Sequence, residues 1–114
     1  MASPAVTCTE IPAAEVFNLL DLVGYQQGSI VSRVLLKREK GNVTLFAFDE
    51  GQGLSEHTAP FDALVQGIEG EGEVTISGQP FTVKPGELIL LPAQQPHAVK
   101  AVTSFKMLLT MIRA

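Results

Sequence analysis

The sequence predicts an all-β fold, either a sandwich or a barrel of short antiparallel strands. From residue 28 onward, runs of β-branched, aliphatic and aromatic residues are separated by glycine, proline and asparagine at short intervals. Turn signals about every 8–12 residues are typical of such all-β domains. Beyond residue 24 no stretch has a convincing helical repeat. These three observations favour strands over helices for most of the chain.

The N-terminal residues are ambiguous. Within residues 12–23 apolar side chains recur at helical spacing, but the run FNLLDLV would also suit a short strand. We expect residues 1–27 to form an N-terminal segment, a tail with a short helix or strand, that contacts a second subunit. The β-barrel then occupies residues 28–114.

The strands are expected in regular order along the barrel. They cover residues 29–36, 43–48, 61–68, 73–77, 81–84, 87–91, 97–102 and 105–112. The runs 73–77 and 81–84 alternate on either side of Gly78-Gln79, which predicts a hairpin. The last run, FKMLLTMI, is apolar on both faces. That pattern suits a strand covered on both sides and indicates a homodimer interface.

Length and composition restrict the classes of function. The chain has 114 residues, 46% of them hydrophobic and 18% charged, which fits one globular domain. Its net charge of −4 and its lack of a basic patch argue against nucleic acid as a partner. No apolar run reaches the length of about 18–20 residues that crosses a bilayer, and no signal peptide is predicted. The single cysteine, Cys8, cannot form an internal disulfide, which is compatible with a cytoplasmic location.

The chemistry that the sequence offers centres on two histidines. His57 ends the run GQGLSEH, and His97 lies in KPGELILLPAQQPHAV. The chain has no other imidazole. Ser55, Glu56 and His57 lack the glycine-flanked elbow of a nucleophilic serine, so hydrolysis is not favoured. No glycine-rich run links a strand to a helix, so no nucleotide cofactor is expected.

The spacing of residues around the two histidines resembles two motifs of the cupin superfamily. In the first motif Gly51, His57 and Gly70 match the family's glycine, histidine and second glycine. In the second motif, the glycine, proline and histidine positions are occupied by Gly86, Pro92 and His97. The chain thus resembles the small, single-domain, RmlC-like type over about residues 28–112. The resemblance implies a double-stranded β-helix, or jelly-roll barrel, with a ligand pocket inside.

Other motif positions depart from the family. Ala59 and Ala63 stand where the second histidine and the glutamate are expected, and Gln94 and Ala101 replace a glycine and an asparagine. In an alternative register His57 is the second histidine, Ser55 replaces the first, and Asp62 replaces the glutamate. We prefer the first register because it satisfies both flanking glycines. The choice matters, since a shift of one residue turns a strand's side chain to the other face.

The resemblance implies a metal site, for Fe, Mn, Ni or Zn, that keeps only His57 and His97. Catalytic metals usually have three protein ligands and an open position. Asp62 or Glu56 is the expected third ligand, because a carboxylate has suitable chemistry; Gln66 is expected on the opposite face of its strand from Ala63. Two alternatives stay open: both histidines line a metal-free pocket, or one of them is packed in the core with a satisfied hydrogen bond.

The small residues at the motif positions predict a roomy, apolar barrel mouth. It would suit a small apolar ligand with one polar group that reaches a histidine. Phenylalanine and methionine side chains from the core could instead fill the space. The residues expected to line the pocket are Ser55, Ala59, Phe61, Ala63, Val65, Val99 and Ala101.

Three functions remain compatible with the sequence. The first is a barrel that binds a small molecule in its interior and has a degenerate two-histidine metal site. The second is a metal-dependent enzyme of the dioxygenase or isomerase class, in which a carboxylate or water completes the metal shell. The third is a barrel that contributes only dimerisation. The loss of two of the four family ligands favours binding over catalysis.

Overall fold

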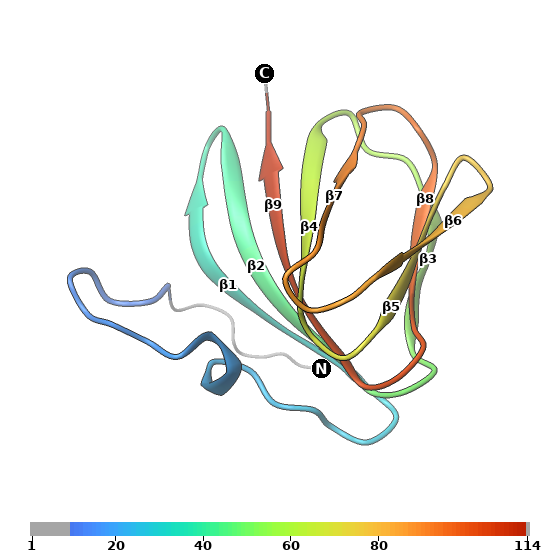
Figure 1. Cartoon of the computed structure of the whole chain (residues 1–114). Helices are drawn as coiled ribbons and strands as arrows, with labels where there is room; N and C mark the ends of the chain where they lie inside the picture. The colour runs from blue at the N-terminus through green and yellow to red at the C-terminus, as the bar shows by residue number, and fades with distance from the viewer. Residues whose placement is uncertain (1–9, 114) are drawn as a thin grey trace.

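The structure is a computed structural model that describes residues 10–113. Within this range two antiparallel sheets face each other and enclose the core, which confirms the all-β jelly-roll barrel (Figure 1). The strands are β1 (Ile30–Arg38), β2 (Gly41–Phe48), β3 (Gly53–His57), β4 (Asp62–Glu69), β5 (Gly72–Ile76), β6 (Gln79–Val83), β7 (Leu88–Leu91), β8 (His97–Ala101) and β9 (Phe105–Ile112). A short 3-10 helix, η2 (Leu19–Asp21), precedes them.

The order of strands in the sheets places distant parts of the chain side by side. Sheet A has the order β1-β2-β9-β4-β7, and sheet B has the order β3-β8-β5-β6. The last strand, β9, therefore lies between β2 and β4, and β8 lies between β3 and β5. Figure 1 shows the β3–β4 and β7–β8 connections at the same end of the barrel, at the top of the view. This end is called the mouth below.

The core lies between the inner faces of the two sheets. Phe48 and Phe105 are fully buried with ring centroids 5.9 Å apart, and Val65 and Val74 are also fully buried. Alternation along each strand sends every second residue inward, so the two sheets contribute apolar side chains to one cluster. Burial of this apolar surface is the main stabilising contribution to the barrel.

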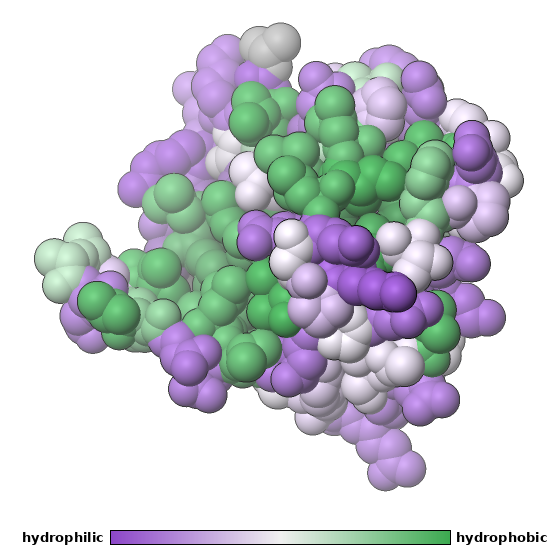
Figure 2. All heavy atoms as spheres, viewed as in Figure 1, coloured by the Kyte–Doolittle hydropathy of each residue, from purple (hydrophilic) through white to green (hydrophobic). Residues whose placement is uncertain are grey.

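A second apolar cluster lies on the outer face of sheet A. Leu35, Leu45 and Ala47 are buried there beneath the N-terminal segment, which contributes Val23. In Figure 2, apolar side chains gather over β9, β4 and β7 and again towards the N-terminal segment at the left. Sheet A therefore buries apolar residues on both faces, as the pattern of its last strand predicts.

Polar contacts also hold the N-terminal segment on sheet A. The buried Lys106 ammonium donates a hydrogen bond to the Leu20 carbonyl (2.8 Å) and lies 3.8 Å from the Glu69 carboxylate. The Tyr25 hydroxyl donates to the same carboxylate (2.6 Å), and the Lys106 ammonium lies 5.1 Å from the Tyr25 ring centroid. Burial, and then the Glu69 carboxylate, raise the pKa of the Tyr25 hydroxyl well above its ordinary value. These contacts offset the cost of burying the Lys106 charge.

All eight predicted strands occur in the structure, with ends that differ by at most two residues. The predicted hairpin is formed by β5 and β6. Strand β3 was not predicted, because its sequence GLSEH is short, mostly exposed and polar. Residues 12–23 contain no strand, and helical geometry there is limited to η2, where the Asn18 side chain accepts a hydrogen bond from the Leu20 amide (3.0 Å). Cys8 lies outside the described residues, within which no helix is long and apolar enough to cross a membrane.

Candidate functional site

The two histidines lie side by side at the mouth of the barrel. They are Cα partners across the antiparallel β3–β8 pair, although 40 residues separate them in the sequence. Their rings meet edge to face, with centroids 4.4 Å apart and an interplanar angle of 71°. The two Nε2 atoms are 3.1 Å apart. His97 is buried and His57 is exposed, so the pair joins the interior to the surface.

A β-bulge in β3 aims His57 at its partner. Leu54 pairs with Val99 and packs against the core, but the register shifts between Leu54 and His57. A bulge inserts an extra residue, so side chains three apart can share a face. Ser55, two residues before His57, instead lines a shallow depression of about 380 Å³ that includes Thr75 and Lys100. These two alternate with buried core residues, so the depression lies on the outer face of sheet B.

Backbone hydrogen bonds determine which ring nitrogens face each other. The Nδ1 of His57 lies 2.9 Å from the Ser55 carbonyl oxygen, and that of His97 lies 3.2 Å from the Gln95 carbonyl oxygen. A carbonyl can only accept, so each hydrogen bond requires a proton on Nδ1. When both rings are neutral, each Nε2 is then an unprotonated acceptor. Two lone pairs converge on one point, where a proton, a donor group of a ligand or a cation would bind.

The surroundings disfavour a charged ring at His97. Burial is the largest effect and lowers the pKa of His97. The hydrogen bond to the Gln95 carbonyl acts in the opposite direction, and the nearby His57 lowers the pKa further. The His97 Nε2 therefore keeps its lone pair to a lower pH than an ordinary histidine, which suits a ligating or accepting nitrogen.

The carboxylates expected to complete a metal shell are not grouped with the two histidines. Asp62 is exposed and its Oδ1 accepts a hydrogen bond from the Ala93 amide (2.8 Å), which fixes the β7–β8 connection. Glu56 is exposed beside the bulge. Within residues 10–113, no group of three or more His, Cys, Asp or Glu side chains is placed to hold a metal ion. The third ligand from Asp62 or Glu56 stays a prediction.

The two imidazoles alone fit part of a metal shell. Neighbouring nitrogen ligands about 2.0–2.1 Å from one ion lie roughly 3 Å from each other, and the Nε2 atoms are 3.1 Å apart. Imidazole nitrogen suits Zn, Fe and Ni. His57 and His97 would hold such an ion, with water or ligand oxygens at its remaining positions.

Most of the predicted pocket residues lie on the inner faces of the sheets. Four are buried: Ala63, Val65, Val99 and Ala101. Ala63 faces inward and Gln66 is exposed, as the first motif register predicts. Phe61 precedes β4, and the Arg113 guanidinium carbon lies 5.6 Å from its ring centroid. The Ala59 carbonyl accepts a hydrogen bond from the Gln94 amide (2.7 Å), which ties the β3–β4 and β7–β8 connections together.

Three motif glycines, Gly51, Gly70 and Gly86, have a positive φ. Gly70 has φ +74°, and a Cβ there would clash with the Ser104 carbonyl oxygen. Gln94, which replaces a motif glycine, also has a positive φ of +67°. A glutamine in this conformation carries a cost in strain.

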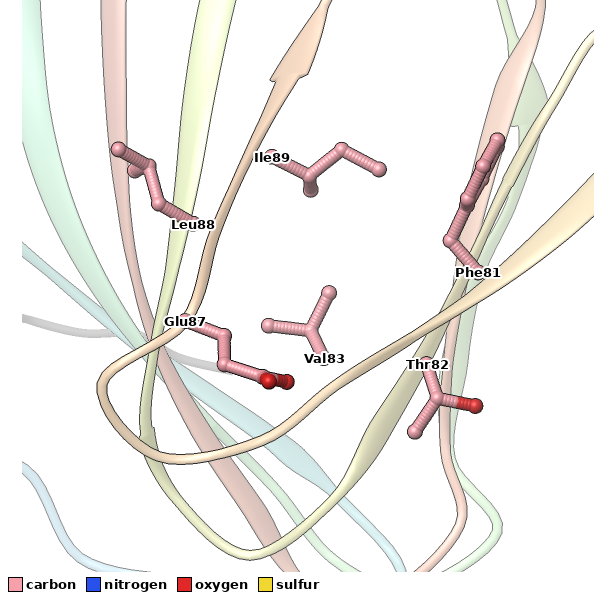
Figure 3. Close-up of a pocket in the computed structure, with 6 residues that line it drawn as sticks. All are labelled: Phe81, Thr82, Val83, Glu87, Leu88 and Ile89. Atoms are coloured by element: carbon pink, nitrogen blue, oxygen red, sulfur yellow. The ribbon is translucent and has the colours of Figure 1, made fainter.

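A groove lies between β6 and β7, which are edge strands of the two sheets. It measures about 440 Å³ and does not include either histidine. Figure 3 shows Ile89 and Val83 pointing into the space between the strands and Leu88 pointing away from it. Phe81 and Glu87 complete its walls. Sequence reasoning missed this groove, because the edges of two sheets are known only once the strand order is known.

Comparison with known proteins agrees with this architecture. The family model of the cupin domain matches residues 44–113. The chain belongs to the cupin family. This cupin is similar to a conserved protein of unknown function from Streptococcus pyogenes, with 34% identity over 98% of each chain and a TM-score of 0.88. No match is found among the curated proteins.

Two further solved structures are similar to this cupin. A cupin 2 conserved barrel domain protein from Leptotrichia buccalis has 47% identity and a TM-score of 0.82 over 85% of this chain. The match covers 47% of that longer protein. A cupin superfamily protein from Desulfitobacterium hafniense has 24% identity and a TM-score of 0.87. The match covers 93% of this chain and 97% of that protein. At 24% identity, the similarity to the Desulfitobacterium hafniense protein shows a shared fold alone.

Proposed function

We propose that this cupin binds a small molecule at the mouth of its barrel, with His57 and His97 as a degenerate, two-histidine anchor. One observation carries the proposal: each Nδ1 lies within hydrogen-bond distance of a backbone carbonyl oxygen, and the two Nε2 atoms face each other 3.1 Å apart. Two imidazole nitrogens that converge on one point at the barrel mouth favour a ligand with a polar group that binds between or beside them.

We infer that the protein is located in the cytoplasm. We also infer that it acts as a homodimer, and that neither nucleic acid nor a membrane is its partner. The net charge of −4 supports the absence of a nucleic-acid surface, since phosphate backbones are bound by clustered lysine and arginine. The lone cysteine is compatible with a reducing compartment. We infer that the barrel, residues 28–114, binds the ligand and that residues 1–27 contribute to the dimer.

A thermal-shift screen of small metabolites tests the ligand proposal. We expect at least one compound to raise the Tm of the wild-type protein and of a Gln66→Ala control, whose side chain is exposed on the other face of β4. The same compound should leave a His57→Ala/His97→Ala double variant unchanged. Equal shifts in all three proteins, or none in the wild type, would contradict the proposal.

A metal-dependent enzyme of the dioxygenase or isomerase class is the second candidate. The 3.1 Å separation of the Nε2 atoms favours it, because that is the spacing of two ligands of one ion. A bound ion would polarise a substrate oxygen. The role of the chain's own residues would be to hold the ion through Nε2 and to fix both rings through the Nδ1 hydrogen bonds.

Elemental analysis separates the two candidates. The untagged wild-type protein should hold about one equivalent of Fe, Mn, Ni or Zn if the enzyme proposal holds, and the double variant should lose it. Wild-type protein that stays free of metal after incubation with all four ions would exclude the enzyme candidate and leave the metal-free pocket.

A further inference from the structure

The end of β9 brings an arginine to the mouth of the barrel. Figure 1 shows β9 ending at the same end of the barrel as the β3–β4 connection. Its last residue, Ile112, pairs with Asp62. The next pair along these antiparallel strands is therefore Arg113 with Phe61, and the Arg113 guanidinium carbon lies 5.6 Å from the Phe61 ring centroid. The Arg113 amide donates to the Lys40 carbonyl (2.7 Å), which continues the β2–β9 ladder and fixes the backbone there.

The Arg113–Phe61 pair belongs to the inward-facing side of sheet A. Two residues deeper, Ala63 pairs with Met111, and both contribute to the core between the sheets. Side chains alternate along a strand, so positions two apart share a face. Phe61 is half-buried and Arg113 is exposed, as expected where the core meets solvent. The pair thus forms the rim of the barrel interior on sheet A, while the two histidines lie on sheet B.

The Arg113 guanidinium has no partner of opposite charge among residues 10–113. The ion pairs in this part of the chain join Arg38 to Glu10 and Lys106 to Glu69. A guanidinium over an aromatic ring keeps the N–H donors at its edge available. These donors form a fork that matches the two oxygens of a carboxylate. Arg113 can therefore donate to a carboxylate that a ligand supplies.

The acidic residue nearest in register does not neutralise Arg113. Asp62 lies opposite Ile112, on the other face of the strand pair from Phe61, and its Oδ1 accepts from the Ala93 amide. The chain as a whole has a net charge of −4, which disfavours the approach of an anion. An acid that binds at the mouth therefore depends on a local cation, and Arg113 supplies one.

The depth of the two groups limits the size of a ligand that touches both. At the far end of the barrel, the Phe105 ring packs on Gly72, which pairs with Ala101. From this level His97 lies four residues along β8, and Arg113 lies eight residues beyond Phe105. At about 3.3 Å per residue, and with sheets about 10 Å apart, the two backbones are roughly 16 Å apart. The side chains shorten this gap to roughly 6–10 Å, the length of a molecule with about six to eight carbons.

We propose that the mouth binds a small organic acid, in which Arg113 recognises the carboxylate and the His57–His97 pair binds a hydroxyl at the other end. This ligand class rests on the proposed function, because it names the ligand of the same two-histidine anchor. Two Nε2 acceptors suit a hydroxyl donor. Arg113 determines specificity, since an uncharged analogue of the acid lacks the group that the guanidinium fork binds.

An NMR titration with matched probes tests the ligand class. The probes are straight-chain hydroxy acids of that length, with the hydroxyl opposite the carboxylate, and the primary amides of the same acids. The wild type should bind the acid about tenfold or more tightly than the amide, because hydrogen bonds to charged groups are the stronger ones. Arg113→Gln should remove this preference and leave the affinity for the amide unchanged. Arg113→Lys should restore part of it, since lysine keeps the charge without the fork.

A second exposed cation provides the matched control. Lys100 lies on the outer face of sheet B, away from the mouth, so Lys100→Gln should bind the acid like the wild type. Arg113 is also exposed, so its replacement should leave the fold intact, which circular dichroism and Tm would check. Added salt should weaken binding of the acid more than binding of the amide.

The outcomes separate this proposal from the one on which it rests. Equal affinity for acid and amide, or acid binding unchanged by Arg113→Gln, would overturn the role of Arg113 and leave the two-histidine anchor in place. A His57→Ala/His97→Ala variant should bind neither probe. If that variant bound the acid like the wild type, the two-histidine anchor would be overturned instead. A wild type that binds neither probe would overturn the ligand class, whereas the thermal-shift screen decides the anchor itself.

Discussion

The outer faces of the two sheets differ in what they present. Sheet A carries leucine, valine and isoleucine outward and buries part of them under the N-terminal segment. Sheet B carries Glu73, Thr75 and Lys100 outward, where they line a shallow depression. Sheet B also holds both histidines, one on β3 and one on β8. Sheet A thus buries apolar residues on both of its faces, whereas the candidate site belongs to sheet B.

The largest expected difference between the sheets lies in their aromatic residues. Phe105 of β9 is fully buried, whereas Phe81 of β6 is 38% exposed at a sheet edge. Phe105→Ala should lower the free energy of unfolding by about 3–5 kcal/mol. Phe81→Ala should lower it by only about 1–2 kcal/mol, because much of its surface is already in water. Urea unfolding would measure both, and equal losses would contradict the assignment of the core.

Two lysines on the outer faces offer a matched comparison. Lys106 of sheet A is buried and donates to the Leu20 carbonyl, whereas Lys100 of sheet B is exposed. Lys106→Met should cost about 1–3 kcal/mol, since it leaves a carbonyl without its donor and Glu69 without its cation. Lys100→Met should change stability by about 0.5 kcal/mol or less. Thermal unfolding of both variants measures the two changes in stability. A neutral Lys106→Met would contradict the predicted difference.

The lowered pKa of His97, a residue of sheet B, predicts that the free energy of unfolding depends on pH. An unfolded histidine takes up a proton below about pH 6.5, whereas the folded His97 resists protonation. The unfolded chain then binds more protons, so the free energy of unfolding falls as the pH drops from about 6.5 towards the lower folded pKa. Full stability returns above about 6.5. A His97→Gln variant should lose this contribution, and an unchanged pH profile in urea titrations would argue against it.

The smallest expected effect concerns the loop beside the histidines. Gln94 has φ +67°, a conformation that glycine adopts without strain. Gln94→Gly should therefore stabilise the protein by up to about 1 kcal/mol. A rise in Tm would support the assignment of this position as a motif glycine. A fall would show that the glutamine side chain stabilises the loop.

The sequence predicts the fold class because alternation and turn residues are local signals. The hairpin of β5 and β6 and the extent of β9 follow directly from such patterns. The pairing of β9 between β2 and β4 does not, since it joins residues 37 to 71 positions apart in the sequence. The N-terminal residues were ambiguous because their apolar side chains pack on sheet A rather than on each other. Tertiary packing, and not local propensity, determines their structure.

The candidate site was predictable in its residues and not in its geometry. Motif spacing identifies His57 and His97, but only the β3–β8 register brings the rings together. The bulge at residues 55–56 breaks the two-residue alternation, so Ser55 lies outside the barrel although simple parity places it with His57. No sequence pattern marks a bulge of this kind, because it depends on how the partner strand pairs.

The most direct test of the site is nitrogen NMR of the protein with ¹⁵N-labelled histidine rings. The account predicts that at about pH 8, above the ordinary histidine pKa of about 6.5, both rings carry their proton on Nδ1 and have an unprotonated Nε2. One equivalent of Zn²⁺ should then shift both Nε2 resonances together, and Gln66→Ala should behave in the same way. Rings protonated on Nε2, or a response of one ring only, would contradict a site built from the two histidines.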